Sequence, residues 1–409
     1  MAGIVYAQEK TGWVEESAGE WKYYDSDGYM LTDSWKKQGN DWYYLDEDGS
    51  VAVSRQVDEY YVDESGKRVS DTWLSVDNDE WFDDAPMNYW FYYGKNGKMV
   101  TDKWMSIDGQ WYYFDGEGHM LTGLQEVGEA TYYFGDDGAR KYGWFQLEET
   151  DESLDREFSW FYFDKSGKML VDETDKKIGD AYYTFADGRM QTGWVLTDKD
   201  AAREDSAAGY QYYGEDGKRA SGWLTIVGVD GVAGEDEEFS FYFKNGKPYC
   251  AETGIQVFSV NSKKYGFNTR GEMQTGLQTV TREDGSTGTC YFGEDGVMRV
   301  GRQTIYDEDL GENQVWYFST DGSNKGIGYT GIRDNVIYDG GLRLEADADL
   351  RLAPVTFEDK QYLVNVNGTV QKAGSTSKSA SKPELGSGYK DFKDENEVIW
   401  TVNTEGIIQ

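Results

Sequence analysis

The sequence predicts an all-β fold: an elongated β-hairpin solenoid built from tandem aromatic repeats. Aromatic residues make up 16% of the 409, and there are 50 Gly but only 4 Pro, a composition typical of short strands and tight turns. One pattern of aromatic clusters and acidic turns recurs from residue 12 to residue 330. The turns hold Asp-Gly or Asn-Gly between aromatics, which is the strongest short-range signal for a hairpin.

Each copy of the repeat contains a leading tryptophan, a short turn, an aromatic cluster and an acidic turn. The clearest copies run from Trp35 to Gly49 and from Trp104 to Gly118. After the turn glycine come a hydrophobic pair and then Thr-Gly or Thr-Asp, as in residues 120–123. The turn glycines lie about 20 residues apart in short copies and about 30 in long ones. Each copy therefore predicts one β-hairpin.

These hairpins need one another to persist, because a lone two-stranded hairpin is barely stable in water. We expect successive hairpins to stack and to bury their aromatic faces against their neighbours. Each Tyr or Trp can bury about 150–250 Å² in such a contact. The repeat pattern therefore predicts a stack without a broad aliphatic core.

Acidic insertions lengthen some of the copies. Residues 148–157 and 198–208 lie between the leading tryptophan and the aromatic cluster of their copies. Because both occupy the same place in the repeat, we expect them to project from one face of the solenoid. The sequence leaves open whether they contact a partner or are simply solvated.

The chain divides into three predicted segments. Residues 1–9 have the small residues of a signal-peptide remnant, with a cleavage site after Ala7, so we expect an exported protein. Residues 10–331 hold the repeats. Residues 332–409 hold degenerate terminal repeats, of the kind that cap a stack, with a Ser/Lys/Gly-rich linker near 374–388.

Composition and charge exclude several functions. The 76 acidic residues outnumber the 40 basic ones and give a formal net charge of −36, which disfavours nucleic acid as a partner and leaves cationic ligands open. No stretch approaches the ~20 apolar residues of a membrane span. With one histidine, His119, and two isolated cysteines, Cys250 and Cys290, His-based catalysis and zinc sites are excluded. The repeated aspartates are typical of turns, so we expect no enzyme, no metal and no cofactor.

In the copies at Trp35–Gly49 and Trp104–Gly118, and in the Met-x-Thr-Gly segments such as Met190–Gly193, the sequence resembles the choline-binding or cell-wall-binding repeat family, which is related to glucan-binding repeats. The resemblance implies a superhelical stack with ligand sites between successive repeats, in a secreted protein associated with the cell surface or the cell wall. It also implies that a site is a cage made by the leading Trp and the cluster Trp of one repeat and a Tyr of the next. Ring faces attract a quaternary ammonium through cation–π interactions.

Carried over residue by residue, the resemblance gives four candidate cages. Strand alternation places the cluster Trp and the second Tyr of a cluster on one face, which determines the choice of tyrosine. The candidate ligand-binding residues are Trp13, Trp21 and Tyr44; Trp35, Trp42 and Tyr61; Trp104, Trp111 and Tyr133; and Trp144, Trp160 and Tyr183. The copies led by Trp194 and Trp223 replace the cluster Trp by Tyr210 and Phe239, and an insertion separates Trp73 from Trp90. These copies are therefore not among the four.

Three functions remain open. The first is binding of a cell-wall polymer such as choline-substituted teichoic acid, with several weak cation–π sites acting together. The second is binding of an α-glucan or another carbohydrate, whose rings would stack on exposed aromatics. The third is a structural or adhesive surface spacer, in which all aromatics are core. The sequence leaves the oligomeric state open.

Overall fold

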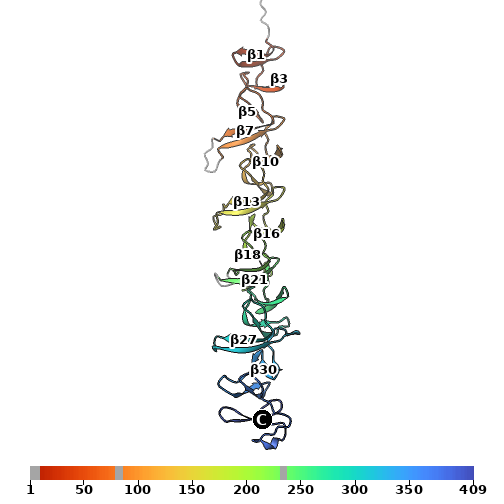
Figure 1. The fold of residues 1–409 in the computed structure, drawn as a ribbon. Coiled ribbons are helices and arrows are strands. Elements are labelled where there is room, and N and C mark those ends of the chain that lie inside the picture. The colour runs from red at the N-terminus through yellow and green to blue at the C-terminus, as the bar shows by residue number, and fades with distance from the viewer. Residues whose placement is uncertain (1–9, 79–85, 231–236) are drawn as a thin grey trace, which may run out of the picture. The chain divides into compact units, whose positions relative to one another are not determined.

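The structure, a computed structural model, describes residues 10–78, 86–230 and 237–409 (Figure 1). The signal-peptide remnant predicted at residues 1–9 lies outside this described part. The described residues contain thirty-five strands and one short 3-10 helix, so the all-β prediction is confirmed. The chain divides into two compact units, one made of Met1–Glu173 with Phe185–Met190 and the other of Thr174–Thr184 with Gln191–Gln409.

The first unit is a series of antiparallel hairpins, each formed by two strands that are consecutive in the sequence. The pairs are β1 (Gly12–Ser17) with β2 (Glu20–Tyr24), β3 (Ser34–Gln38) with β4 (Asp41–Leu45), β5 (Arg55–Val57) with β6 (Tyr60–Val62), β7 (Thr72–Asp77) with β8 (Asn88–Tyr93), β9 (Lys103–Ile107) with β10 (Gln110–Phe114), β11 (Gly123–Val127) with β12 (Ala130–Phe134), and β13 (Gly143–Glu148) with β14 (Phe158–Phe163).

The sheet of β15 (Glu173–Ile178), β16 (Ala181–Ala186) and β17 (Arg189–Met190) contains the division between the units. The second unit continues with β18 (Gly193–Leu196) and β19 (Tyr210–Tyr213), then β20 (Gly222–Val227), β21 (Glu238–Lys244) and β22 (Lys247–Pro248), then β23 (Ile255–Val260) with β24 (Lys263–Asn268) and β25 (Gly276–Thr281) with β26 (Thr287–Phe292).

The last strands of the second unit depart from the simple hairpin pattern. Here β27 (Gly301–Asp307), β28 (Glu312–Phe318), β29 (Gly331–Arg333), β30 (Val336–Asp339) and β31 (Leu342–Arg343) form one five-stranded sheet in the order β27-β28-β31-β30-β29. Two hairpins follow, β32 (Leu352–Phe357) with β33 (Lys360–Asn365) and β34 (Lys390–Lys393) with β35 (Ile399–Val402). The degenerate copies in the sequence thus still form paired strands.

The acidic turns owe their aspartates to local hydrogen bonds. In one such turn, the Asp63 carboxylate accepts hydrogen bonds from the backbone N–H of Ser65 at 2.8 Å and of Lys67 at 2.9 Å. Gly66 completes the turn at φ +77°, in the left-handed region that favours glycine. Although burial opposes ionisation, the hydrogen bonds from Ser65 and Lys67 hold the pKa of Asp63 below its ordinary value. These carboxylates therefore stabilise turns.

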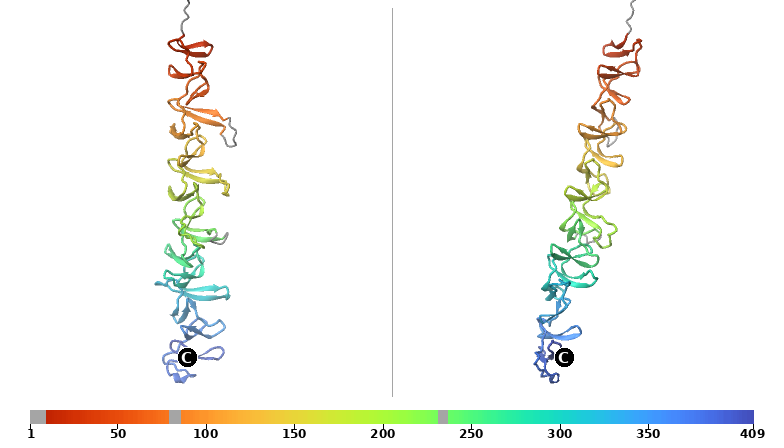
Figure 2. Two further views of the ribbon diagram at one scale, coloured as in Figure 1. Left: turned by 180° about the vertical axis from the view of Figure 1, so that it is seen from behind. Right: turned by 90° about the vertical axis from the view of Figure 1, so that its right-hand side faces the viewer.

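A recurring backbone hydrogen bond joins many of the hairpins to their neighbours. The residue that follows an acidic turn donates its N–H to a carbonyl of the preceding hairpin: Met120 to Trp90 at 2.8 Å and Arg140 to Trp111 at 2.7 Å in the first unit, and Arg219 to Tyr182 at 2.9 Å in the second. In each unit the hairpins follow one another in chain order, as two further views show (Figure 2). The hairpin solenoid that the repeats predict is therefore present in both units.

The core is a chain of small clusters. One of them contains Tyr92, Val100, Ile107 and Phe114, with Trp73 and other half-buried side chains packed against it. The last residue of the second strand, such as Phe114, is fully buried in many of the hairpins. Each cluster draws on neighbouring hairpins, so stability depends on contact between repeats, as the sequence predicts.

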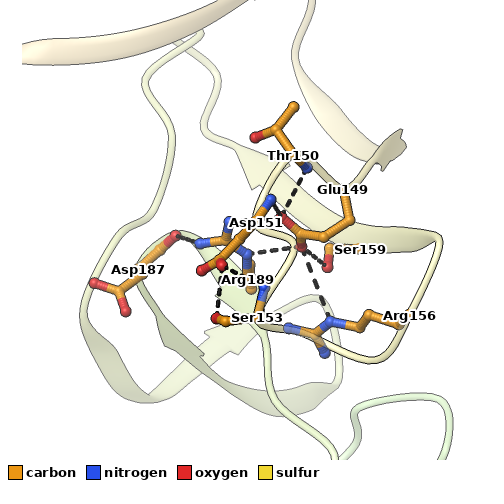
Figure 3. A network of polar contacts seen from close by, with 8 residues as sticks. All are labelled: Glu149, Thr150, Asp151, Ser153, Arg156, Ser159, Asp187 and Arg189. Carbon is orange, nitrogen blue, oxygen red and sulfur yellow. Dashed lines mark hydrogen bonds and ion pairs between the residues drawn. The ribbon is translucent and has the colours of Figure 1, made fainter.

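The acidic insertion at 148–157 is anchored to the first unit at its base (Figure 3). Arg189 donates a bidentate pair of hydrogen bonds to the Glu149 carboxylate, from Nη2 at 2.6 Å and from Nε at 2.8 Å. The Ser159 hydroxyl donates a further hydrogen bond to the same carboxylate. The Glu149 side chain is only 2% exposed. The hydrogen bond from Arg189 is the main cause that holds the pKa of Glu149 far below its ordinary value.

The Ser/Lys/Gly-rich segment near 374–388 is tethered rather than extended. It contains the 3-10 helix η1 (Pro383–Leu385). The Asp391 carboxylate accepts hydrogen bonds from the Ser379 hydroxyl at 2.5 Å and from the backbone N–H groups of Ala380 and Ser381 at 2.9 and 2.8 Å. Burial opposes ionisation of Asp391, but these hydrogen bonds hold its pKa well below the ordinary value.

Candidate functional site

Successive hairpins meet at a joint, which four side chains line. The leading residue and the first residue of the aromatic cluster come from one hairpin. The third side chain comes from the second strand of the next hairpin, two residues before that strand's buried end, and the fourth is the residue that follows its turn. In what we call the Trp73 joint, these residues are Trp73, Trp90, Tyr112 and Met120.

The Trp73 joint brings three aromatic rings together. The ring centroids of Trp73 and Trp90 are 6.5 Å apart at an interplanar angle of 79°, and those of Trp73 and Tyr112 are 5.0 Å apart at 69°. Trp90 remains 43% exposed, while Met120 packs beside Trp73 against the core. Two tryptophans, a tyrosine and a methionine thus lie around one partly open position.

Strand register explains why these rings meet. Trp73 lies directly opposite Tyr92 in the β7–β8 pair, and their rings touch edge to face at 5.1 Å. Trp90 precedes Tyr92 by two residues, so it projects from the same face of the hairpin. The Tyr92 hydroxyl donates a 2.6 Å hydrogen bond to Asp71, and burial together with this bond raises the pKa of Tyr92 to about 12.

The Trp13 joint has the same tryptophan pair with a smaller fourth residue. Trp13 contacts Tyr43 of the next hairpin at 5.5 Å, and Trp21 is 41% exposed. Val51 holds the position of Met120, since it forms the equivalent bridge after the turn. This joint therefore offers three rings and an aliphatic side chain.

In two further joints, an arginine takes the place of the methionine. In the Trp35 joint, the Arg68 guanidinium carbon lies 5.9 Å from the ring centroid of Trp35, 5.5 Å from that of Trp42 and 5.0 Å from that of Tyr60. All three distances fall within the range of a cation–π contact.

In the Trp104 joint, the Arg140 guanidinium carbon lies 5.6 Å from the ring centroid of Trp104 and 5.9 Å from that of Trp111. Tyr132 of the next hairpin completes the joint at 4.8 Å from Trp104. Position and contacts thus repeat those of the Trp35 joint.

Three of the four candidate tryptophan pairs lie in joints, but the tyrosines predicted with them lie in other contacts. In each of these joints the leading tryptophan contacts the residue just before the candidate tyrosine of the following hairpin. The contacts are Trp13 with Tyr43, Trp35 with Tyr60, and Trp104 with Tyr132. The candidates had been Tyr44, Tyr61 and Tyr133. Tyr44 packs on Trp35 of its own hairpin, Tyr61 contacts Tyr93, and Tyr133 contacts Phe145 and Phe163.

The fourth candidate set divides between the two units. Trp144 and Trp160 belong to β13 and β14 of the first unit, where Trp160 is 42% exposed. Tyr183 belongs to the second unit and is buried. The copy led by Trp73, which was not among the four candidate cages because of its insertion, instead forms a joint with three aromatic rings.

Other joints lack the tryptophan pair. Trp223 lies opposite Tyr242, so the residue at the cluster position is Ser240 and not the Phe239 that the sequence suggests. In the Asp175 joint of the second unit, Asp175, Tyr182, Gln211 and Arg219 hold the four positions. Neither joint can present a complete aromatic cage.

The described part of the chain shows neither a metal-binding cluster nor a membrane-spanning helix. In the described part of the chain, no three His, Cys, Asp or Glu side chains are grouped so as to hold a metal ion. Within the described ranges, none of the helices has the length and hydrophobicity that a membrane-spanning segment needs.

Comparison with known families matches the repeats directly. Residues 10–56 and 87–122 match the choline-binding repeat, and residues 122–139 and 159–169 match the putative cell wall binding repeat. These matches cover the tryptophan pairs of the Trp13, Trp35 and Trp104 joints, and Trp90 but not Trp73 of the Trp73 joint.

Curated relatives include two streptococcal enzymes. Glucosyltransferase-S of Streptococcus mutans is 26% identical over 318 residues, 73% of this chain, and glucosyltransferase-I of Streptococcus downei is 26% identical over 325 residues. The matches cover 16% and 18% of those proteins. The chain thus spans less than a fifth of the length of these relatives.

Similar solved structures come from Streptococcus pneumoniae. Choline binding protein F is 19% identical with a TM-score of 0.41 and coverage of 70% of this chain and 98% of that one. CbpJ is 18% identical with a TM-score of 0.42 and coverage of 73% and 100%, and the autolysin LytC is 19% identical with a TM-score of 0.41 and coverage of 64% and 52%.

The hairpin stack and its aromatic joints define a class, the aromatic hairpin-repeat proteins. Within that class, the matched repeats of this chain are repeats of the choline-binding and cell-wall-binding family. The resemblance that the sequence shows is therefore confirmed.

Proposed function

We propose that this chain is a non-catalytic, exported binding protein that attaches to a bacterial cell-wall polymer through choline-type quaternary ammonium groups. The observation that carries the proposal is the Trp73 joint, where the rings of Trp73, Trp90 and Tyr112 surround a partly exposed position beside Met120. A quaternary ammonium cannot donate hydrogen bonds, and ring faces offer it the negative potential that it needs.

Two further features support a polymer as the ligand. A single cation–π contact contributes about 0.5–2 kcal/mol, so one joint binds weakly. A polymer that carries many cations can engage several joints at once and gain affinity through effective concentration. The net charge of −36 favours the approach of a cation and opposes that of an anion.

The test is substitution of Trp90 by alanine. Because Trp90 is 43% exposed, its removal should change stability little, while the Trp73 joint loses one wall of its cage. We expect retention on an amine resin and elution by free choline for the native chain, and at least a tenfold weaker choline affinity at this joint for Trp90→Ala, measured by titration with tryptophan fluorescence. Tyr142→Ala, which removes a 67% exposed ring outside the joint, is the matched control. Equal choline binding by Trp90→Ala and the control would refute the proposal.

A second candidate is binding of an α-glucan, which the match to two glucosyltransferases over 73% of this chain favours. Exposed rings such as Trp21 and Trp111 could stack on sugars. A glucan ligand would bind to the native chain in the presence of excess choline and would not release it from an amine resin. A dextran titration with and without choline separates the two candidates.

A further inference from the structure

The Trp35 and Trp104 joints hold a cation that belongs to the protein itself. Arg68 lies over the rings of Trp35, Trp42 and Tyr60, at 5.0–5.9 Å from their centroids. An external ammonium would need the same ring faces at the same distances, because the attraction extends only to about 6 Å from a ring centroid. One ring cage cannot hold both cations.

The arginines are placed by the backbone and not by a carboxylate. Both Arg68 and Arg140 follow an acidic turn and occupy the position that Met99, Met120 and Met169 occupy in other joints. Among the described residues neither arginine forms an ion pair, and the Nε atom of Arg140 is buried without a hydrogen-bond partner. In a chain with 76 acidic residues, a guanidinium that lies on tryptophans instead of a carboxylate is held by the rings.

The stems of these side chains are confined as well. A Cβ atom built on Gly97 would lie 2.6 Å from Nε of Arg68, and one built on Gly167 would lie 2.5 Å from Cδ of Arg140. Each arginine therefore runs directly beneath the next turn. Both glycines also have positive φ angles, +79° and +82°, so a larger residue is disfavoured there for two reasons.

Arg219 shows what the same position does when a carboxylate is available. In the Asp175 joint, the leading tryptophan is replaced by aspartate, and Arg219 pairs with Asp175 at 2.9 Å while it lies 4.1 Å over Tyr182. The identity of the leading residue thus decides whether the arginine enters an ion pair or a ring cage.

We infer that Arg68 and Arg140 are resident cations that close the Trp35 and Trp104 joints to external quaternary ammonium ligands, and that they determine which joints of this chain bind. The inference rests on the proposed function, because it assigns the joints that the same class of ligand can enter. The Trp73 joint, with Met120, and the Trp13 joint, with Val51, remain open.

The experiment counts choline sites by equilibrium dialysis on the full chain. Arg68→Met and Arg140→Met replace the cation by the residue that other joints carry, so the fold accepts the change. Each substitution should add one site, and the double variant should add two. Arg299→Met is the matched control, since Arg299 is an exposed partner of Asp295 outside the ring cages, and it should add none.

A second measurement needs no substitution. In the native chain, the δ-methylene protons of Arg68 and Arg140 should show upfield ring-current shifts by NMR, and saturating choline should leave these shifts unchanged. Displacement of either arginine by choline would overturn the inference.

The outcomes separate the inference from the proposed function. Choline binding by the native chain with no added sites in the arginine variants would overturn the inference alone. Binding only by the arginine variants would support the inference and overturn the proposed function. Absence of binding in every variant would overturn both.

Discussion

The Trp104 joint of the first unit and the Asp175 joint of the second unit use one backbone arrangement for opposite chemistry. In both, the residue after the turn is an arginine whose N–H donates to the preceding hairpin, at 2.7 Å for Arg140 and 2.9 Å for Arg219. The Trp104 joint is filled by rings and a stacked guanidinium. The Asp175 joint is filled by an ion pair and hydrogen bonds.

The Asp175 joint shows that the hairpin stack does not require a tryptophan pair. Asp175 accepts hydrogen bonds from the Tyr213 hydroxyl at 3.0 Å and from Nε2 of Gln211 at 3.2 Å, in addition to its pairing with Arg219. These contacts satisfy groups that the joint buries, as buried polar groups require. Since polar contacts can hold a joint together, stacking of the hairpins does not by itself require a tryptophan pair.

The largest effect should come from Trp73→Ala. Trp73 packs against Trp90, Tyr92, Tyr112 and Phe114, so its removal leaves a cavity between two hairpins. Truncation of a packed tryptophan costs about 3 kcal/mol or more. We expect a loss of this size in the amide hydrogen-exchange protection of β7–β10.

The matched control for Trp73→Ala is the exposed Tyr142, whose replacement by alanine should change that protection by less than about 0.5 kcal/mol. If Trp73→Ala proved as mild as the control, the leading tryptophans would not be core residues. The assignment of a packing role to the leading tryptophans and of a ligand-facing role to the cluster tryptophans would then be wrong.

A smaller loss should follow Asp175→Ala. The Asp175 side chain is 29% exposed and that of Arg219 is 15% exposed, so part of the ion pair is screened by solvent. Removal of the carboxylate leaves Arg219 without its ion-pair partner, while the Tyr213 hydroxyl keeps its hydrogen bonds with Gln211 and Thr184, and we expect a cost of about 2 kcal/mol. Hydrogen exchange of β18–β19 would report the loss. Asp175→Asn, which keeps an acceptor for the Tyr213 hydroxyl but removes the charge, should fall between native and alanine.

The sequence predicts the repeats, the hairpins and the tryptophan pairs, because these depend on local signals. Period-two alternation places Trp104 and Trp111 on one face of their hairpin. The third ring comes from the next hairpin, where Tyr132 rather than Tyr133 contacts Trp104. Which tyrosine faces the joint depends on packing between hairpins, which no single strand encodes.

The resident arginines had a signal that sequence reasoning missed. Arg140 follows its turn glycine by two residues, as Met120 does, so aligning the copies places a cation where the motif has methionine. The structure was needed to show that the side chain turns onto the rings of Trp104 and Trp111. A substitution at a motif position is therefore informative when the motif residue lines a site.

The smallest effect concerns pH and the polar anchor of the first unit, which offers an internal contrast to the aromatic joints. The pKa of Glu149 is lowered chiefly by the hydrogen bond from Arg189. A carboxyl whose pKa is lower in the folded state contributes stability above its unfolded pKa, near 4.3, and loses that contribution as pH falls through the folded value.

Between pH 6 and 8, protection of the 148–157 insertion should therefore stay constant. In acid below about pH 4 the protection factors of its amides should fall, while those of amides around the Trp73 joint, held by rings, should not. Glu149→Gln should abolish this difference, because the glutamine cannot titrate; a native chain whose insertion and Trp73 joint respond alike to acid would show that Glu149 is not the anchor.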